Sequence, residues 1–196
     1  MRRKKILVIV AHPDDETIWL GGTLLANRDE WKATIISLCR REDRDRQPRF
    51  KKACKILKAK GFMSDLDDSE KEYFKKIKTN DIINRIKKFT DGKRYDYIFT
   101  HGKNGEYGHI RHKEVHKAVK EMLENEKLAW KVFFFAYKKK NRICSADKSA
   151  DKFIKLSNLI FKRKKILIQK IYGFEKNSFE ERCCKNIEAF DVEDLK

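Results

Sequence analysis

The chain has few of the residues that separate domains or cross-link small folds. Its 196 residues include two prolines and eight glycines, and no stretch is rich in proline, glycine or serine. The five cysteines are odd in number and form no Cys-x-x-Cys pair, which argues against a disulfide framework. We therefore expect a single domain over residues 1–196, reduced thiols and a cytoplasmic location.

Long hydrophobic runs are also missing, and no segment approaches the length needed to cross a bilayer. Residues 6–11 are apolar and follow a basic start, which superficially imitates a signal peptide. The run is too short for that function, and His12-Pro13-Asp14-Asp15 follows it at once. A strand that is buried on both faces of a parallel sheet explains such a run better.

Positive charge, by contrast, is abundant: 48 Lys and Arg face 30 Asp and Glu, for a net charge of +18. The excess is +8 over residues 1–60, +3 over 61–137 and +7 over 138–196, so no single segment carries it. Dense basic runs such as 138–140 and 162–165 are more often solvated surface than phosphate contacts. We therefore do not expect nucleic acid as the main partner, although the basic surface is consistent with an anionic small-molecule substrate.

Short apolar runs alternate with amphipathic stretches, which is the pattern of βαβ units. Strands are predicted over residues 5–10, 33–39, 95–100 and 132–137, and a helix over 17–28. Apolar residues at helical spacing predict further helices over 50–57, ended by Gly61, and over 82–89, 115–123 and 179–190. The predicted fold class is α/β, a Rossmann-like and mainly parallel sheet with helices on both faces.

The histidines are few and clustered. Four of the five fall within residues 101–116, directly after the predicted strand that ends at Thr100. The fifth, His12, follows the first predicted strand and precedes three carboxylates, whose mutual repulsion a dication would remove. Because ligands of open α/β sheets bind beyond the carboxyl ends of the strands, both segments are placed where a site is expected.

These residue types suit a catalytic zinc ion, which takes three imidazole or carboxylate ligands and leaves one position for water. His12 and Asp15 lie on either side of a proline-stiffened turn and can converge on one ion. The third ligand must then come from the second histidine segment. Asp14, which cannot share the direction of its neighbour, would face the metal-bound water as general base.

The two segments closely resemble the PIG-L/LmbE-like zinc deacetylases. The shared motifs are Ala-His-Pro-Asp-Asp-Glu over residues 11–16, Thr-His over 100–101 and Gly-Glu-Tyr-Gly-His-Ile-Arg-His over 105–112. The family includes N-acetylglucosaminyl-phosphatidylinositol deacetylases and the deacetylases of mycothiol and bacillithiol synthesis. The resemblance is clearest over residues 4–119 and fades in the last third of the chain. It implies a zinc-dependent N-deacetylase that converts an N-acetylglucosamine-type sugar conjugate to the free amine and acetate.

The resemblance also implies roles for single residues. It makes His12, Asp15 and His112 the ligands of Zn²⁺, a position that another divalent ion would also fit, and it makes Asp14 the general base. The alternative interpretation of the acidic run is structural: the three carboxylates form an ordinary first turn of a helix, where the helix dipole stabilises negative charge. His116 borders an apolar helix face and is expected to pack there, while His101 is left without an assigned role.

Protonated His109 would stabilise the oxyanion by the same resemblance, and Tyr107 would assist at the tetrahedral intermediate. The family usually has Pro-Asp where this chain has Ile110-Arg111, and a cation there would lower the pKa of His109. We therefore expect a compensating carboxylate within hydrogen-bond distance of His109 Nδ1. The candidates are Glu106, Asp67 and Asp68.

Two other functions stay open at this point. One is a zinc hydrolase of another N-acyl metabolite, and the other is a basic protein that binds nucleic acid or an anionic surface on the same fold. An intact set of ligands and a base argues against the second, whereas the net charge of +18 favours it. The sequence is compatible with self-association.

Overall fold

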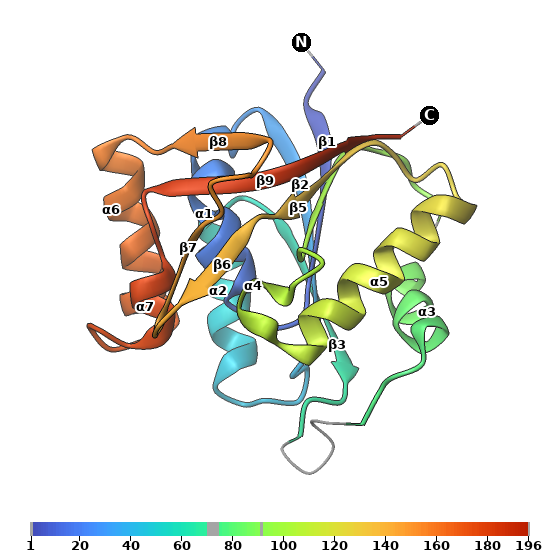
Figure 1. Cartoon of the computed structure of the whole chain (residues 1–196), viewed down its shortest axis with the longest axis horizontal. Coiled ribbons are helices and arrows are strands. Elements are labelled where there is room, and N and C mark those ends of the chain that lie inside the picture. The colour runs from blue at the N-terminus through green and yellow to red at the C-terminus, as the bar shows by residue number, and fades with distance from the viewer. Residues whose placement is uncertain (1, 70–74, 91, 196) are drawn as a thin grey trace.

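The computed structural model of the chain describes residues 2–69, 75–90 and 92–195. A seven-stranded sheet forms its centre, in the order β3-β2-β1-β4-β5-β9-β8 (Figure 1). The strands are β1 (Lys4–Val10), β2 (Trp31–Cys39), β3 (Lys60–Leu66), β4 (Tyr95–Thr100), β5 (Ala129–Phe135), β8 (Lys152–Lys155) and β9 (Ile187–Asp194). A separate hairpin pairs β6 (Tyr137–Lys140) with β7 (Ile143–Ala146).

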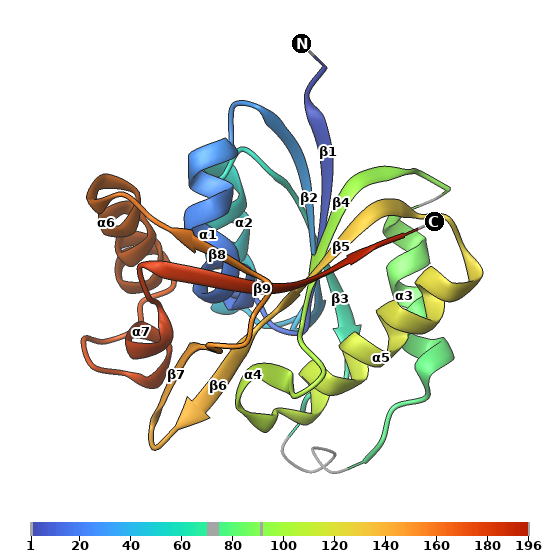
Figure 2. The ribbon, with the colours of Figure 1, turned by 45° about the horizontal axis from the view of Figure 1, so that its top comes forward.

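Helices cover both faces of this sheet, as Figure 2 shows. One face carries α1 (Asp15–Asn27), α2 (Arg46–Ile56), α6 (Asn158–Ile166) and α7 (Phe179–Cys183), and a π-helical turn, Leu167–Ile171, follows α6. The other face carries α3 (Thr79–Thr90) and α5 (Ile110–Asn125), and the short α4 (Gly105–Gly108) precedes α5. Within the described ranges, no helix combines the length and apolar character that a membrane span requires. The α/β prediction is confirmed.

The strand β1 occupies the centre of the parallel part of the sheet. It pairs in parallel with β2 on one side and with β4 on the other, and residues 6–10 are fully buried. Because β1 has helices on both faces, a continuous apolar run fits it better than an alternating one. Because β2 and β4 lie on opposite sides of β1, the strand order reverses at β1. A topological switch point therefore lies at the carboxyl ends of β1 and β4.

The prediction that Gly61 ends the second helix was wrong. The helix α2 ends at Ile56, with Leu57 as its C-cap, and Lys58 then adopts the left-handed conformation (φ 53°). Gly61 lies in the unpredicted strand β3, close against α2. A Cβ at Gly61 would lie 2.6 Å from Cys54 Sγ and 2.9 Å from Phe50 Cε1, so the strand can approach the helix only with glycine here.

The predicted closing helix over 179–190 was also wrong. Only Phe179–Cys183 is helical, and the chain then forms β9, which runs antiparallel between β5 and β8. Glu188 and Phe190 face the side of the sheet that carries α1 and α6, whereas Ala189 packs against Ala136 on the other side. Side chains that point alternately to the two faces of a sheet are the mark of a strand.

A buried ion pair ties β9 to the helices. Glu188 accepts hydrogen bonds from the backbone nitrogens of Gly22 and Thr23, each at 2.8 Å, and from Lys164 Nζ at 2.6 Å. Both charged side chains are fully buried. The single carboxylate thus joins β9, α1 and α6.

We predict that Lys164→Met lowers the free energy of unfolding by about 3–5 kcal/mol, because it leaves the Glu188 charge buried without its cation. Urea denaturation followed by circular dichroism measures this change. Lys165→Met is the matched control, since the Lys165 side chain is itself 24% exposed, and loss of its pair with Glu181 should cost much less. Equal losses in the two variants would contradict the assigned role.

Candidate metal and catalytic site

The candidate site lies at the carboxyl ends of β1 and β4. His12 follows β1 and His101 follows β4, and the two strands are neighbours that run in the same direction. Their ends therefore open on one edge of the sheet. The pocket at this edge has a volume of about 160 Å³. Its lining includes His12, Asp14, Asp15, Arg40, Arg46, Asp68, Tyr107, His109 and Phe179.

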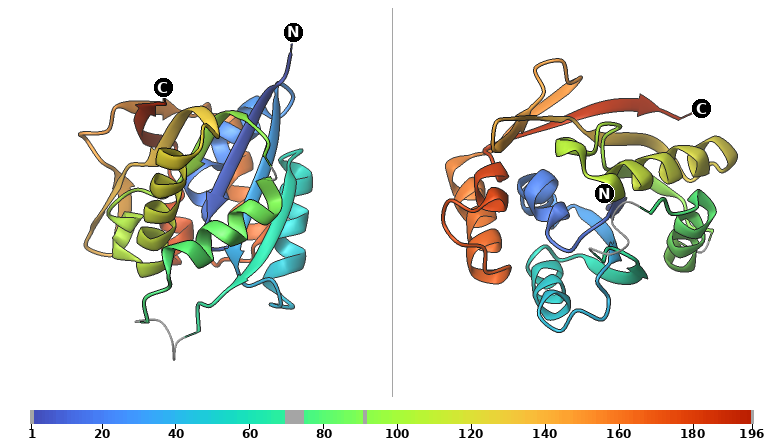
Figure 3. Two further views of the ribbon diagram at one scale, coloured as in Figure 1. Left: turned by 90° about the vertical axis from the view of Figure 1, so that its right-hand side faces the viewer. Right: turned by 60° about the horizontal axis from the view of Figure 1, so that its bottom comes forward.

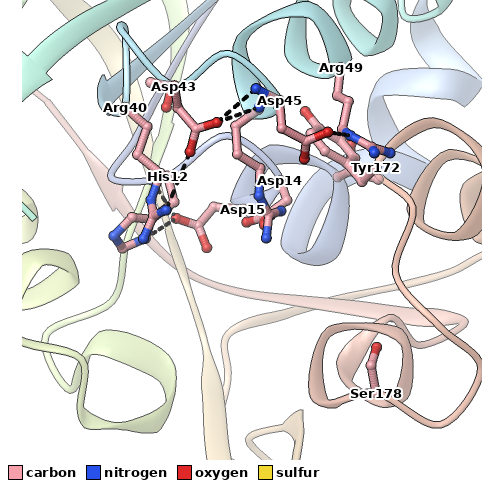
Figure 4. Close-up of polar contacts among 12 residues, drawn as sticks. His12, Asp14, Asp15, Arg40, Asp43, Asp45, Arg49, Tyr172 and Ser178 are labelled. Carbon is pink, nitrogen blue, oxygen red and sulfur yellow. Dashed lines mark hydrogen bonds and ion pairs between the residues drawn. The ribbon is translucent and has the colours of Figure 1, made fainter. Parts of the chain in front are cut away.

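Three donor atoms of the predicted ligands form a nearly equilateral triangle. His12 Nδ1 lies 3.2 Å from His112 Nε2, and Asp15 Oδ2 lies 3.3 Å from each of these nitrogens. Figure 4 shows His12 and Asp15 in contact, with Asp14 and Arg40 nearby. Ligands about 2.0–2.1 Å from a tetrahedral ion are roughly 3.3 Å from one another. The three atoms therefore have the spacing of one face of a zinc coordination sphere.

A buried carboxylate orients His112. Glu106 Oε2 accepts hydrogen bonds from His112 Nδ1 at 2.5 Å and from His101 Nδ1 at 2.9 Å, and Gly102 N donates to Oε1. Because Nδ1 of His112 is occupied in this way, Nε2 is the nitrogen presented to the triangle. Support of the outer nitrogen by a carboxylate is the usual arrangement for a metal-bound histidine.

His101 supports the site from behind. Its Nε2 accepts a hydrogen bond from the backbone N–H of Ala11 at 2.9 Å, so Nδ1 must carry the proton that is donated to Glu106. Burial and the nearby His112 lower the pKa of His101, in keeping with a neutral ring. His116 donates to the carbonyl oxygen of His101 and packs against Phe134, so it has a structural role.

Asp68 is the partner of His12, a role that the sequence did not reveal. Its Oδ2 lies 3.1 Å from His12 Nε2 and 3.2 Å from Arg40 Nη2. Burial disfavours the charged carboxylate, but His12 and Arg40 lower the pKa of Asp68 to about 2. The two histidines of the triangle thus each have an ionised carboxylate at the outer nitrogen. No local signal connects positions 12 and 68, because only the folded sheet brings them together.

Asp14 occupies an unusual backbone conformation beside the triangle. Its φ of 137° is rarely adopted by residues other than glycine, and its N–H donates to Glu16 Oε2. Glu16 is itself buried and bound by the Tyr172 hydroxyl at 2.7 Å. The Asp14 carboxylate pairs with Arg46 at 3.0 Å. Burial and the neighbouring Asp15 nevertheless raise the pKa of Asp14 well above its usual range.

None of the three candidate carboxylates, Glu106, Asp67 and Asp68, forms a hydrogen bond with His109 Nδ1, so this expectation was wrong. Glu106 is bound to His101 and His112, and Asp68 contacts His12, while Asp67 accepts from the backbone of Ser69. Burial, His112 and His12 lower the pKa of His109 to about 3. The ring is therefore neutral near pH 7, so its expected protonated state is not supported.

Arg111 has a different role from the one that its position in the motif suggested. The side chain is fully buried, and it donates to the carbonyl oxygens of Asp67 at 2.7 Å and Lys75 at 3.0 Å. It also pairs with Glu114 on α5 at 2.8 Å. Arg111 thus links Asp67, the neighbour of Asp68, to α5, the helix that carries His112.

Tyr107 forms an aromatic wall of the pocket. Its ring centroid lies 5.5 Å from that of His109, 5.2 Å from that of His112 and 5.0 Å from that of Phe179, in each case edge-to-face. The structure thus brings all six predicted site residues to one pocket or its immediate border. Phe179, which the sequence did not single out, comes from α7 in the last third of the chain.

Comparison with known proteins identifies a family and a curated relative. Residues 7–123 match the model of PIG-L, described as GlcNAc-PI de-N-acetylase. Protein L374 of Acanthamoeba polyphaga mimivirus is 27% identical over 125 residues, which are 58% of this chain and 55% of the viral protein. The chain therefore spans about half the length of that relative.

Two solved structures share the fold. The conserved protein TT1542 from Thermus thermophilus has a TM-score of 0.72 and 14% identity, with 98% of this chain and 96% of that chain covered. The N,N'-diacetylchitobiose deacetylase from Pyrococcus horikoshii has a TM-score of 0.69 and 14% identity, with 97% and 84% covered. At this identity the likeness is one of fold, and it extends over the last third of the chain, where the sequence motifs end.

The titration state of His112 predicts that metal binding releases a proton. Burial opposes protonation of His112, but Asp15 and Glu106 raise its pKa to about 10, so the metal-free ring is charged near pH 7. A metal needs the unprotonated Nε2, so affinity for Zn²⁺ should rise with pH between about pH 6 and pH 8. Calorimetry in HEPES and Tris measures the proton release, and a pH-independent affinity would contradict this prediction.

The hydrogen bond from His112 predicts the effect of Glu106→Gln. Loss of the charged acceptor should weaken metal binding roughly 10–100-fold, because the ligand becomes less basic and less well oriented. Competition with a chelating dye measures the affinity. Glu124→Gln on the exposed face of α5 is the control and should bind as the unaltered chain does. Unchanged affinity of the Glu106→Gln protein would show that the triangle is not the metal site.

Proposed function

The chain belongs to the PIG-L family, and from this premise we propose that it is a metal-dependent N-deacetylase of an N-acetylglucosamine-type sugar conjugate. The observation that carries the proposal is the triangle of His12, Asp15 and His112 beside the buried carboxylate of Asp14. Amide hydrolysis needs an electrophilic centre for the carbonyl and a proton acceptor for water. This pocket offers residues for both.

The proposed metal is Zn²⁺, held by His12 Nδ1, Asp15 Oδ2 and His112 Nε2. Two imidazoles and one carboxylate are a usual ligand set for catalytic zinc, and the spacing of the three atoms fits such an ion. When bound, the ion polarises the acetamide carbonyl and makes water more acidic. Glu106 keeps His112 in the tautomer that this role requires, and Asp68 Oδ2 lies 3.1 Å from the outer nitrogen of His12.

Asp14 is the proposed general base. Its raised pKa makes the carboxylate a stronger proton acceptor than an exposed aspartate, while the ion pair with Arg46 favours the charged form that can accept. The proton removed from water is then held on the Asp14 carboxyl group, next to the pocket. From there it passes to the nitrogen of the leaving amine, so one residue serves as base and then as acid.

His109 is proposed to act as a neutral donor. Because its pKa is lowered to about 3, the ring offers one N–H group to the negative charge that develops on the carbonyl oxygen. A neutral imidazole N–H can stabilise the negative oxygen by a hydrogen bond, and His109 then does not titrate near pH 7. Tyr107 packs edge-to-face on His109, which limits the ring to orientations that face the pocket.

The proposed substrate class rests on the pocket and on a structural neighbour. A volume of about 160 Å³ admits an acetamido group with part of a sugar ring, so the rest of the conjugate would lie outside. The neighbour from Pyrococcus horikoshii is a deacetylase of an N-acetylated sugar. Arg40 lines the pocket and pairs with Asp43 and Asp68, but its side chain is 43% exposed, which leaves part of the guanidinium accessible to an anionic group of the conjugate.

The function is tested by acetate release. Metal-loaded protein is incubated with N-acetylglucosamine conjugates whose second group is neutral or anionic, and acetate is quantified enzymatically. We expect turnover that His112→Ala abolishes, with a preference for the anionic conjugates. Absence of acetate from every conjugate, at full metal occupancy, would overturn the proposed activity.

Separate roles for Asp14 and Asp15 predict different defects. Asp14→Asn should retain the metal and lose roughly 10²–10⁴-fold in kcat, because only the proton acceptor is removed. Asp15→Asn should instead lose metal affinity, because a charged ligand becomes neutral. Metal content by mass spectrometry and kcat are measured on both proteins. Equal loss of metal from the two variants would contradict the assignment.

A further inference from the structure

A second and larger pocket lies at the edge of the sheet opposite the candidate site. Its volume is about 700 Å³. Lys4 and Trp31, the first residues of β1 and β2, line it, as do Asn27 at the end of α1 and Lys152 on β8. In Figure 1 and in the first panel of Figure 3, β1 begins at the upper edge of the sheet, below the label N. Nothing in the proposed deacetylase chemistry uses this pocket.

One wall of the pocket is aromatic. Trp31 and Tyr97 are partly buried and pack against each other with ring centroids 6.4 Å apart. Behind them, Phe99 stacks on Phe133 at 4.6 Å, and both of these rings are buried. Phe99 and Phe133 also line the pocket, but Trp31 and Tyr97 are the more exposed rings of its aromatic wall.

The rim of the pocket carries more positive charge than its surroundings neutralise. Five cations and two carboxylates line it. Arg2 and Lys131 form salt bridges with carboxylates, whereas within the described ranges Arg3, Lys4 and Lys152 form none. Lys4 Nζ binds the Tyr97 hydroxyl at 2.7 Å, and Lys152 Nζ lies 5.6 Å from the centre of the Phe133 ring. These cations would gain most from an anion bound in the pocket.

We propose that this pocket binds a small anion that carries an aromatic ring, with a nucleoside monophosphate as the ligand class. The base would stack on Trp31, with Tyr97, whose ring stands edge-to-face to that of Trp31, against the edge of the base. The phosphate would lie between Lys4 and Lys152 at the rim. Asn27 and Glu30 line the same pocket and offer hydrogen-bonding groups to the base edge. The volume lies within the range of roughly 300–1,000 Å³ that is typical of small-molecule sites.

Titration with adenosine 5′-monophosphate tests the proposal through tryptophan fluorescence. We expect a saturable change, with adenosine alone and inorganic phosphate alone each binding at least roughly tenfold more weakly, because each lacks one half of the recognised chemistry. Trp31→Leu should remove the change. Trp130→Leu, which alters a 63% exposed tryptophan outside the pocket lining, should keep it. No saturable change with the monophosphate would overturn the proposal.

Charge reversal on β8 separates a specific site from diffuse electrostatic attraction. Lys152→Glu should weaken binding of the monophosphate roughly tenfold by calorimetry, and Lys152→Gln should weaken it less. Lys155→Glu makes the same charge change on the same strand, but its side chain points to the other face of the sheet and binding should be unchanged. Acetate release should be unaffected in all three proteins. Equal weakening by Lys152→Glu and Lys155→Glu would indicate non-specific attraction and overturn the proposal.

Discussion

The carboxylate of Glu106 is the group on which the rest of the candidate site depends. It accepts hydrogen bonds from His101 and His112, and His101 in turn accepts from the backbone of Ala11, the residue before His12. One chain of hydrogen bonds therefore connects the end of β1, the end of β4 and the first turn of α5. Glu106 can reach this position because the chain bends sharply there, with a φ of 56°. This backbone conformation is unfavourable, and the hydrogen bonds that connect the ends of β1 and β4 with α5 hold the chain in it.

The charge balance of the site favours a bound cation. Five carboxylates converge on this edge of the sheet, and most of them are buried. These carboxylates belong to Asp14, Asp15, Glu16, Asp68 and Glu106. Asp15 and Glu106 together raise the pKa of His112 to about 10, so in the metal-free chain a proton compensates part of their charge. A divalent ion would compensate it more fully, and the three atoms of the triangle already have the required spacing.

The parts of this fold that could be predicted from sequence are those set by local pattern. Short contiguous motifs contain the apolar run of β1, the strand β4 and the three residues of the triangle. Their placement follows from the rule that the carboxyl ends of neighbouring parallel strands lie at the same edge of the sheet. The parts that were missed depend on contacts between distant segments. A glycine such as Gly61, a few residues after a helical pattern, is typical of a helix C-terminus, and only the packing of β3 on α2 reveals its actual role. The contact between Asp68 and His12 joins positions that are far apart in the chain.

We propose that one divalent ion joins His12, Asp15 and His112. Anomalous diffraction from crystals soaked in Zn²⁺, collected on both sides of the zinc absorption edge, tests this assignment directly. We expect a single strong peak about 2.0–2.1 Å from His12 Nδ1, Asp15 Oδ2 and His112 Nε2, with Asp14 outside the coordination sphere. A peak held by other residues, or a triangle without metal at saturating Zn²⁺, would show that these three residues are not the metal ligands.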